Sequence, residues 1–226
     1  MAARLSGHAA GQKRFLGDIA HELCAPIARL QMALGILEQR ADSTQQPYLD
    51  DLREELAHMS GLVNELMSFS KAGLRAAEVK LQPVRLRELA QRVVDREIPP
   101  GREVTLEIND ALLALAEPEL LARALGNLLR NALRHGGDSG LISISATAGG
   151  ERVRLAVRDC GPGVPEEALS RIFEPFYRVD DSRARETGGI GLGLAIVKTC
   201  VEACRGTVRA RNLQPRGLEV VLDLPT

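Results

Sequence analysis

Apolar residues recur at helical spacing in two runs between residues 16 and 66. From residue 16 to residue 37 they are three or four positions apart, which predicts a helix over about 15–37 with one buried face. The spacing returns from residue 49 to residue 66 as a strict seven-residue repeat. The residues concerned are Leu16, Ile19, Leu23, Ile27, Leu30, Leu34 and Leu37, then Leu49, Leu52, Leu56, Met59, Val63 and Leu66.

A turn is expected between these two helices, because Asp42-Ser43-Thr44 and Pro47 interrupt the pattern. Two amphipathic helices joined by a short turn form an antiparallel hairpin. A single hairpin leaves part of its apolar surface open, whereas two hairpins can cover it in a four-helix bundle. We therefore expect an all-α hairpin that forms a homodimer through the heptad run of its second helix.

The periodicity changes beyond Lys71-Ala72-Gly73. Alternating or β-branched segments predict strands, and longer segments of period 3.6 predict helices. Together they indicate an α+β sandwich, with one sheet covered on one face and a domain boundary near residues 75–82. The expected strands are 103–108, 141–147, 151–158, 207–211 and 217–224, and the expected helices are 85–96, 117–134 and 192–205.

Composition narrows the class of protein. A chain of 226 residues fits one or two domains. A net charge of −1 and 3% aromatic residues argue against a nucleic-acid partner. Cys200 and Cys204 have a spacing that could hold a metal, but no second ligand pair is evident and buried thiols are the alternative. With no run of about 18 apolar residues and no signal peptide, we expect either a soluble protein or the cytoplasmic piece of a longer one.

One histidine stands out on the first helix. With Ile19 at zero and about 100 degrees of turn per residue, the apolar stripe centres near ~40 degrees. His21 falls near ~200 degrees and Ala25 near ~240 degrees, so both are expected on the outer face, with Glu22 at the flank of the stripe. A solvated histidine without a chemical role is the alternative. However, Pro26 follows in mid-helix, where it costs about 3 kcal/mol and bends the helix.

Several features of the second domain suit a bound nucleotide. Asn127, Asn131 and His135 share one face of a predicted helix. The carboxamides of the two asparagines could hold Mg²⁺ and phosphate oxygens. Asp159 ends a strand in the segment DCGPGVP and could accept a hydrogen bond from an adenine amino group. An ordinary polar helix face and an ordinary turn are the respective alternatives.

The segment GGIGLGLAIVK is the most specific of these features. Its glycines precede an apolar helix, so backbone N–H groups can face an anion at the helix N-terminus. It is not a Walker loop, because GxxxxGK[ST] is absent. It is not a dinucleotide fingerprint either, because no βαβ unit with a following acidic residue is present.

At the first helix, the segment AHELCAP resembles the phosphoacceptor box of bacterial sensor histidine kinases. The resemblance implies that His21 is the phosphorylated residue, that Glu22 assists the transfer and that Pro26 bends the helix. The chain departs from the family at Cys24 and Ala25, where Arg and then Thr, Ser or Asn are usual. A polar residue at the second of these positions often orients water in the family, so a poor phosphatase is expected here.

The remaining motifs resemble, in order and spacing, the ATP-binding domain of the same family and of the wider GHKL superfamily. NLLRNALRH resembles the N box, DCGPG the first glycine box, IFEPFYR the F box and GIGLGL the second glycine box. By this resemblance Asn131 binds Mg²⁺ with Asn127 as its support, and Arg134 and His135 reach the phosphates. The resemblance also implies that Asp159 binds adenine beside Gly161 and Gly163, that Phe173 and Phe176 pack an ATP lid, and that Arg178 lies near the γ-phosphate. The remaining residues that it implies for the site are Gly189, Gly191, Leu192 and Gly193.

These expectations combine into one hypothesis. Residues 1–11 end an upstream signalling helix, 12–76 form the dimerising phosphotransfer hairpin, and 80–226 form the catalytic ATP-binding domain. The chain would phosphorylate itself on His21 with ATP and Mg²⁺, then pass the phosphoryl group to an aspartate of a response regulator receiver domain. It would act in the cytoplasm, attached to the inner membrane only through an upstream region. A GHKL-type ATPase or clamp and a non-catalytic dimeric scaffold are the alternatives.

Overall fold

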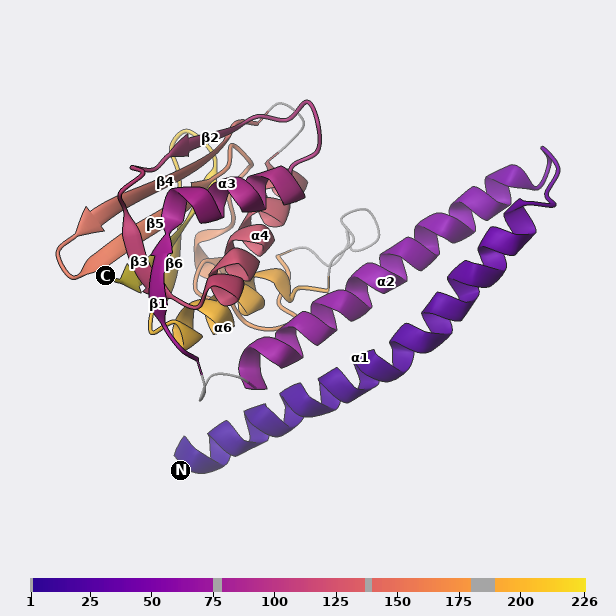
Figure 1. Ribbon diagram of the computed structural model, residues 1–226, viewed down its shortest axis with the longest axis horizontal. Coiled ribbons are helices and arrows are strands. Elements are labelled where there is room, and N and C mark those ends of the chain that lie inside the picture. Colours follow the sequence, from indigo (N-terminus) through magenta and orange to yellow (C-terminus); the bar gives the residue numbers. More distant parts are fainter. Residues whose placement is uncertain (1, 75–78, 137–139, 180–189) are drawn as a thin grey trace. The chain divides into compact units, whose positions relative to one another are not determined.

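Two compact units divide the chain, Met1–Leu74 and Arg75–Thr226 (Figure 1). A computed structural model describes residues 2–74, 79–136, 140–179 and 190–226, and for residues 2–15 and 71–74 it describes the backbone alone. The first unit is a helical hairpin and the second is an α/β domain, as the sequence predicts.

The hairpin consists of α1 (Ala2–Glu38) and α2 (Gln46–Leu74). Between them, the Asp42 carboxylate accepts hydrogen bonds from the backbone N–H groups of Thr44 and Gln45, at 2.9 and 3.0 Å. The sequence assigned Pro47 to this turn, and that was wrong: Pro47 is the second residue of α2. Proline fits there, because the first N–H groups of a helix have no partner within it.

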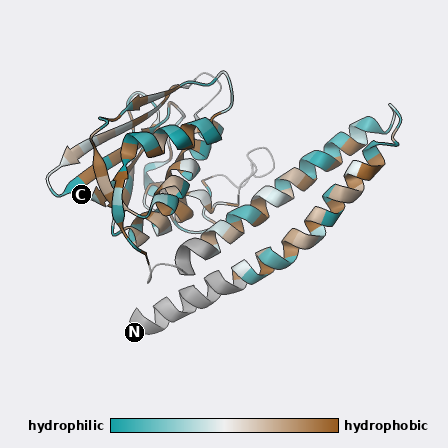
Figure 2. Cartoon of the chain, in the orientation of Figure 1, coloured by the Kyte–Doolittle hydropathy of each residue, from teal (hydrophilic) through white to brown (hydrophobic). Residues whose placement is uncertain are grey.

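Two heptad rows run along the hairpin, offset from each other by one residue. Residues of the inner row other than Gln31 are buried or half-buried, and those of the outer row leave 37–57% of their surface exposed. Figure 2 shows the resulting alternation of apolar and polar residues around both helices. The inner row comprises Ala20, Cys24, Ile27, Gln31 and Leu34 on α1 with Leu49, Leu56, Ser60, Val63 and Met67 on α2; the outer row comprises Ile19, Leu23, Leu30 and Leu37 on α1 with Leu52 and Met59 on α2.

This division corrects one expectation. The sequence treated the run from Leu49 to Leu66 as a single stripe facing a dimer partner. Instead Val63, 6% exposed, packs with Ala20 and Ile27 inside the hairpin. The inner row also contains polar and sulfur contacts: Gln31 donates to the Ser60 hydroxyl at 3.0 Å, and the Cys24 thiol lies 3.5 Å from the Met67 sulfur.

A five-stranded sheet forms the framework of the second unit, in the order β2-β4-β5-β7-β6. The β2–β4 pair is parallel and the other pairs are antiparallel. All five strands were predicted to within two residues at each end. Their bounds are β2 Val104–Glu107, β4 Ile142–Gly149, β5 Arg152–Arg158, β6 Thr207–Asn212 and β7 Leu218–Pro225.

A separate antiparallel pair joins β1 (Gln82–Arg85) to β3 (Leu113–Ala116). The sequence does not predict this pair, for a local reason. Each strand has only four residues, β1 contains Pro83, and β3 lies in an apolar run without alternation. Their pairing depends on contacts between distant segments, which local periodicity does not contain.

Helices α3 (Leu86–Glu97), α4 (Pro118–His135) and α6 (Gly193–Ala203) lie on the same face of the sheet (Figure 1). A 3₁₀ turn, η1 (Glu166–Ala168), precedes the F box. The inner strand positions are apolar and fully buried, as at Ile144, Leu155 and Leu222. At the start of α4, the Glu117 carboxylate accepts from the Leu120 N–H at 2.6 Å and Pro118 occupies the first turn, which fixes where the helix begins.

The outer face of the sheet is charged. Two buried carboxylates on β7 each accept hydrogen bonds from arginines on both neighbouring strands: Asp223 from Arg154 and Arg209, and Glu219 from Arg158 and Arg211. Burial acts to raise the pKa of Glu219, but the hydrogen bonds from Arg211 and Arg158 outweigh it, and its pKa lies below the usual value. The two acids therefore tie β5, β7 and β6 together across this face.

Candidate functional site

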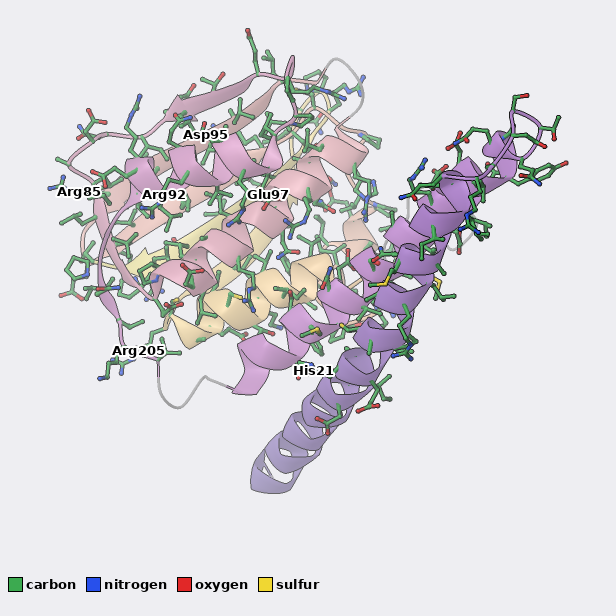
Figure 3. All side chains as sticks on the ribbon, turned by 45° about the vertical axis from the view of Figure 1, so that its right-hand side comes forward. His21, Arg85, Arg92, Asp95, Glu97 and Arg205 are labelled. Carbon is green, nitrogen blue, oxygen red and sulfur yellow. The ribbon has the colours of Figure 1, made fainter. Side chains whose placement is uncertain are left out.

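His21 lies on α1 and is exposed, as the helical wheel predicts (Figure 3). Glu22 and Ala25 are exposed as well, whereas Cys24 is half-buried toward Met67. Pro26 is inside α1, and Figure 1 shows this helix changing direction in its middle. The hairpin thus presents an imidazole with a carboxylate as its sequence neighbour, on a surface open to solvent.

Helix α4 carries the residues of the N box. Asn127 is 5% exposed, and its amide nitrogen donates to the Arg123 carbonyl at 2.8 Å. Its carbonyl oxygen turns toward the start of α6, only 3.7 Å from where a Cβ on Gly193 would lie. Asn131, one turn further along, is half-buried. The N box and the second glycine box therefore meet at the N-terminus of α6.

The Asp159 carboxylate is buried at 7% exposure and held by the backbone. Its Oδ1 accepts from the N–H of Gly161 at 2.9 Å and from the N–H of Leu218 at 3.1 Å. A Cβ at Gly161 would lie 2.5 Å from the His135 carbonyl, so the first glycine box runs against the C-terminal end of α4. Oδ1 thus accepts from two backbone N–H groups of the protein.

Arg134, Asp159 and Arg178 all carry charges that act on His135. His135 is exposed as a residue, yet the protein packed around its ring lowers its pKa. The charges of Arg134 and Arg178 lower that pKa further, and the charge of Asp159 opposes them. Two guanidinium groups and a neutral imidazole form a suitable environment for phosphate oxygens.

The F box and the second glycine box are joined by a backbone hydrogen bond, from the Phe176 N–H to the Gly191 carbonyl at 3.0 Å. Phe173 is buried, whereas Phe176 is 52% exposed and has a φ of 65°, which is rare for a bulky residue. The residues against which Phe176 was expected to pack, and Gly189, lie outside the described residues.

The second glycine box leads into the N-terminus of α6. Leu192 is fully buried just before the helix, and none of the described side chains caps it. The first N–H groups of a helix have no intrahelical partner, and the helix dipole favours an anion there. Gly193 begins the helix, so this end of α6 fits the phosphate-binding role that the sequence implies.

Sequence reasoning missed one part of this region, the turn between β6 and β7. Asn212 makes two hydrogen bonds to Val164, and Arg216 donates to the Cys160 carbonyl at 2.6 Å. Gly163, with φ at +76°, has no room for a Cβ because the Asn212 side chain lies against it. No sequence signal identifies Asn212, because its partners are 48 residues away.

The site suits a magnesium ion by the chemistry of its donors. Magnesium prefers oxygen ligands, keeps several waters and takes few groups from the protein when phosphates supply the rest. Asn131 offers a carboxamide oxygen on the face of α4 that carries Asn127. Within the described part of the chain, no group of three His, Cys, Asp or Glu side chains could hold a metal.

None of the four cysteines forms a disulfide, and Cys200 and Cys204 are buried. The Glu117 N–H donates to the Cys204 sulfur at 3.5 Å, and burial raises the pKa of this thiol.

None of the helices in the described ranges combines the length and apolar character needed to cross a bilayer.

Comparison with known families agrees with this geometry. Residues 12–75 match the His Kinase A (phospho-acceptor) domain. Residues 116–226 match the histidine kinase-, DNA gyrase B- and HSP90-like ATPases. The first match contains His21 and α2, and the second contains α4, Asp159 and the start of α6.

Individual relatives point the same way. The sensor histidine kinase CpxA of Escherichia coli K12 is 34% identical over 219 residues, which cover 95% of this chain and 47% of that protein. Full-length ShkA in complex with AMPPNP superimposes with a TM-score of 0.76 at 32% identity, over 94% of this chain and 45% of ShkA. The ATP-binding domain of PrrB from Mycobacterium tuberculosis gives 0.53 at 30% identity, over 65% of this chain and 97% of that domain.

The chain spans about half the length of curated relatives that it matches, 47% in the case of CpxA. The chain itself carries a phospho-acceptor domain followed by an ATPase-like domain. On these matches the chain belongs to the sensor histidine kinases, of which it carries the phospho-acceptor domain and the ATPase-like domain.

Proposed function

We propose that this chain phosphorylates itself on His21 with ATP and then transfers the phosphoryl group to an aspartate of a receiver domain. One observation carries the proposal: an exposed His21-Glu22 pair on α1 occurs in the same chain as the α4–α6 nucleotide site. ShkA, which this chain resembles over 94% of its length, was solved with AMPPNP, and this supports ATP as the donor.

In the first step, a neutral ring nitrogen of His21 attacks the γ-phosphorus of ATP. An N–P bond forms as the bond to the β,γ-bridging oxygen breaks, and ADP leaves. Glu22 accepts the proton from the ring, which keeps the imidazole nucleophilic. Such transfers depend on positioning and charge neutralisation more than on covalent help from the protein.

The second domain supplies that neutralisation. Arg134, Arg178 and the N–H groups of α6 face the phosphates, and Asp159 Oδ2 accepts from the adenine amino group. Asn131 would hold a magnesium ion, which when bound offsets the negative charge of the phosphates. Asn127, fixed by its bond to the Arg123 carbonyl, supports Asn131 from one turn away.

Dimerisation is the second part of the proposal. The outer row of the hairpin exposes Leu52 and Met59 on α2 and Leu23 and Leu30 on α1. A second copy that packs its own outer row against this one would bury both in a four-helix bundle. His21 is on neither row, so it would stay accessible in the dimer to ATP and to the receiver domain.

We also infer that the chain works in the cytoplasm, as part of a longer membrane-attached sensor. ATP is available there, and the curated relatives are about twice as long as this chain. Fractionation of cells that express the natural gene product would test this location. Recovery in the periplasm would contradict it.

The central test is labelling with γ-³²P-ATP and Mg²⁺. We expect an acid-labile, base-stable label on the parent protein, as a phosphoramidate bond requires. His21→Gln should abolish the label while leaving ADP binding intact, because the two groups lie in separate units. Asn131→Ala should abolish the label and Mg²⁺-dependent nucleotide binding while leaving the dimer intact.

The controls separate the alternatives. An ATPase would release phosphate without a stable label, and a scaffold would neither release phosphate nor become labelled. Substitution of His58, which lies on α2, should leave the label unchanged. Label retained at the parent level by His21→Gln would refute the assignment.

A further inference from the structure

The β6–β7 turn, residues 212–218, lies outside all four nucleotide motifs, yet it contacts the first glycine box along its length. Its contacts run from Asp159 to Val164, with one more at Glu166. They come from both ends of the turn and from its tip, so the turn holds the loop by hydrogen bonds at several points. The inference below rests on the proposed binding of adenine by Asp159.

Asn212 holds the far end of the glycine box. Its side-chain Oδ1 accepts from the Val164 N–H at 2.9 Å, and its Nδ2 donates to the Val164 carbonyl at 2.7 Å. The same Nδ2 lies 3.1 Å from Glu166 at the start of η1. One amide thus satisfies both backbone groups of Val164 and fixes the loop relative to the end of β6.

The other end of the turn holds Asp159 and Cys160. The Leu218 N–H donates to Asp159 Oδ1, and the Leu218 carbonyl accepts from the Asp159 N–H at 3.0 Å. Between these anchors, Arg216 donates from Nε to the Cys160 carbonyl at 2.6 Å. Arg216 is itself exposed, so its removal leaves no cavity in the core.

These contacts set the direction of one carboxylate oxygen. Asp159 Oδ1 is held by one N–H from the glycine box and one from the turn, so the plane of the carboxylate depends on how the turn and the loop are placed. The remaining oxygen, Oδ2, can meet an adenine amino group only if that plane is kept, because hydrogen bonds weaken steeply when misaligned.

We propose that Asn212 and Arg216 are positioning residues that set the adenine selectivity of the nucleotide site, acting through the first glycine box on the Asp159 carboxylate. Guanine carries a carbonyl oxygen where adenine carries its amino group, so a correctly placed carboxylate favours adenine and repels guanine. A displaced carboxylate loses this discrimination while the phosphate contacts on α4 and α6 remain.

The test is the ratio of dissociation constants for GDP and ADP, measured by calorimetry on the full chain. The variants are Asn212→Ala, Arg216→Ala and Asp159→Asn, and Gln214→Ala is the matched control from the same turn. Asn212→Ala and Arg216→Ala should each lower the GDP-to-ADP ratio by about tenfold, which is what one aligned hydrogen bond to a charged group commonly contributes. In Asn212→Ala and Arg216→Ala, the change should fall on nucleotide affinity, while the rate of His21 labelling at saturating ATP follows that of Gln214→Ala.

A loss of folded protein would lower the binding stoichiometry and leave the ratio unchanged, so the ratio separates positioning from stability. Ratios for the Asn212 and Arg216 variants equal to that of Gln214→Ala would overturn the inference. If Asp159→Asn abolishes the preference for ADP and both turn variants keep it, the positioning role of Asn212 and Arg216 is overturned, while the adenine role of Asp159 stands. If Asp159→Asn keeps the preference, the adenine assignment of the proposed function fails as well.

Discussion

Replacing Leu52 and Met59 together with glutamate should convert the protein to monomers. Full burial of a leucine or methionine side chain contributes about 1.5–3 kcal/mol. These two residues still expose 52% and 39% of their surface, so each has about 1 kcal/mol left to gain. Two such residues in each of two chains give about 4 kcal/mol, or about a thousandfold in the dissociation constant of the dimer.

Glutamate would do more than remove this gain, since each buried, unpaired charge costs several kcal/mol. Sedimentation velocity over a range of micromolar concentrations measures the outcome, and circular dichroism checks that the hairpin keeps its helices. Ala57→Glu is the matched control, because Ala57 is exposed on α2 and belongs to neither row. The control should remain dimeric.

Two results would refute the reasoning about the outer row. One is a dimer that survives the double substitution at the parent concentration. The other is dissociation of the Ala57→Glu control, which would show that added charge anywhere on α2 is sufficient. A dimer formed by residues 80–226 alone would move the interface to the other unit.

Three further predictions concern single residues. Ala25→Thr should raise receiver dephosphorylation by about tenfold or more, because threonine restores a group that can orient water; a fast parent rate that the change leaves alone would contradict this. Folding lowers the pKa of His135, so the unfolded chain takes up the proton more readily. The free energy of unfolding should therefore fall as pH drops below about 6.5. Denaturation measured at pH 7.5 and at pH 5.5 should give a smaller difference in unfolding free energy for His135→Gln than for the parent. Glu219→Gln should lower the melting temperature by about 3 °C or more, because Glu219 accepts two charge-assisted bonds.

The Glu219 effect has its own pH window. Since folding lowers the pKa of this carboxyl, its contribution to stability is present at neutral pH and is lost as pH falls through the folded-state value. The difference in melting temperature between parent and Glu219→Gln should therefore shrink toward acid pH. A difference that is constant from neutral to acid pH would argue against the ion pairs as its origin.

The hairpin shows both the strength and the limit of the sequence pattern. Periodicity correctly predicts two helices and the exposure of His21 and Ala25. It cannot separate two rows that are offset by one residue, because a wheel averages them into one stripe. Val63 and Met59 look equivalent in the heptad, but the first is 6% exposed and the second 39%.

A similar limit applies to the nucleotide site. Asp159, Asn127 and Gly193 belong to local motifs. In the structure Asn127 lies near Gly193, and the loop that follows Asp159 lies against the C-terminal end of α4. The roles assigned to them stay predictions. Asn212 and Arg216 have no local pattern, because what matters is a contact to a loop about 50 residues earlier, and only the pairing of β5, β7 and β6 creates it.

The division into two units also has a calorimetric consequence. Each unit has its own buried core, so heating should melt them in two transitions. A ligand stabilises only the state that binds it, by RT ln(1 + [L]/Kd). Excess ADP should therefore shift the transition of the α/β domain and leave that of the hairpin in place, so the distance between the two peaks becomes a direct gauge of nucleotide occupancy.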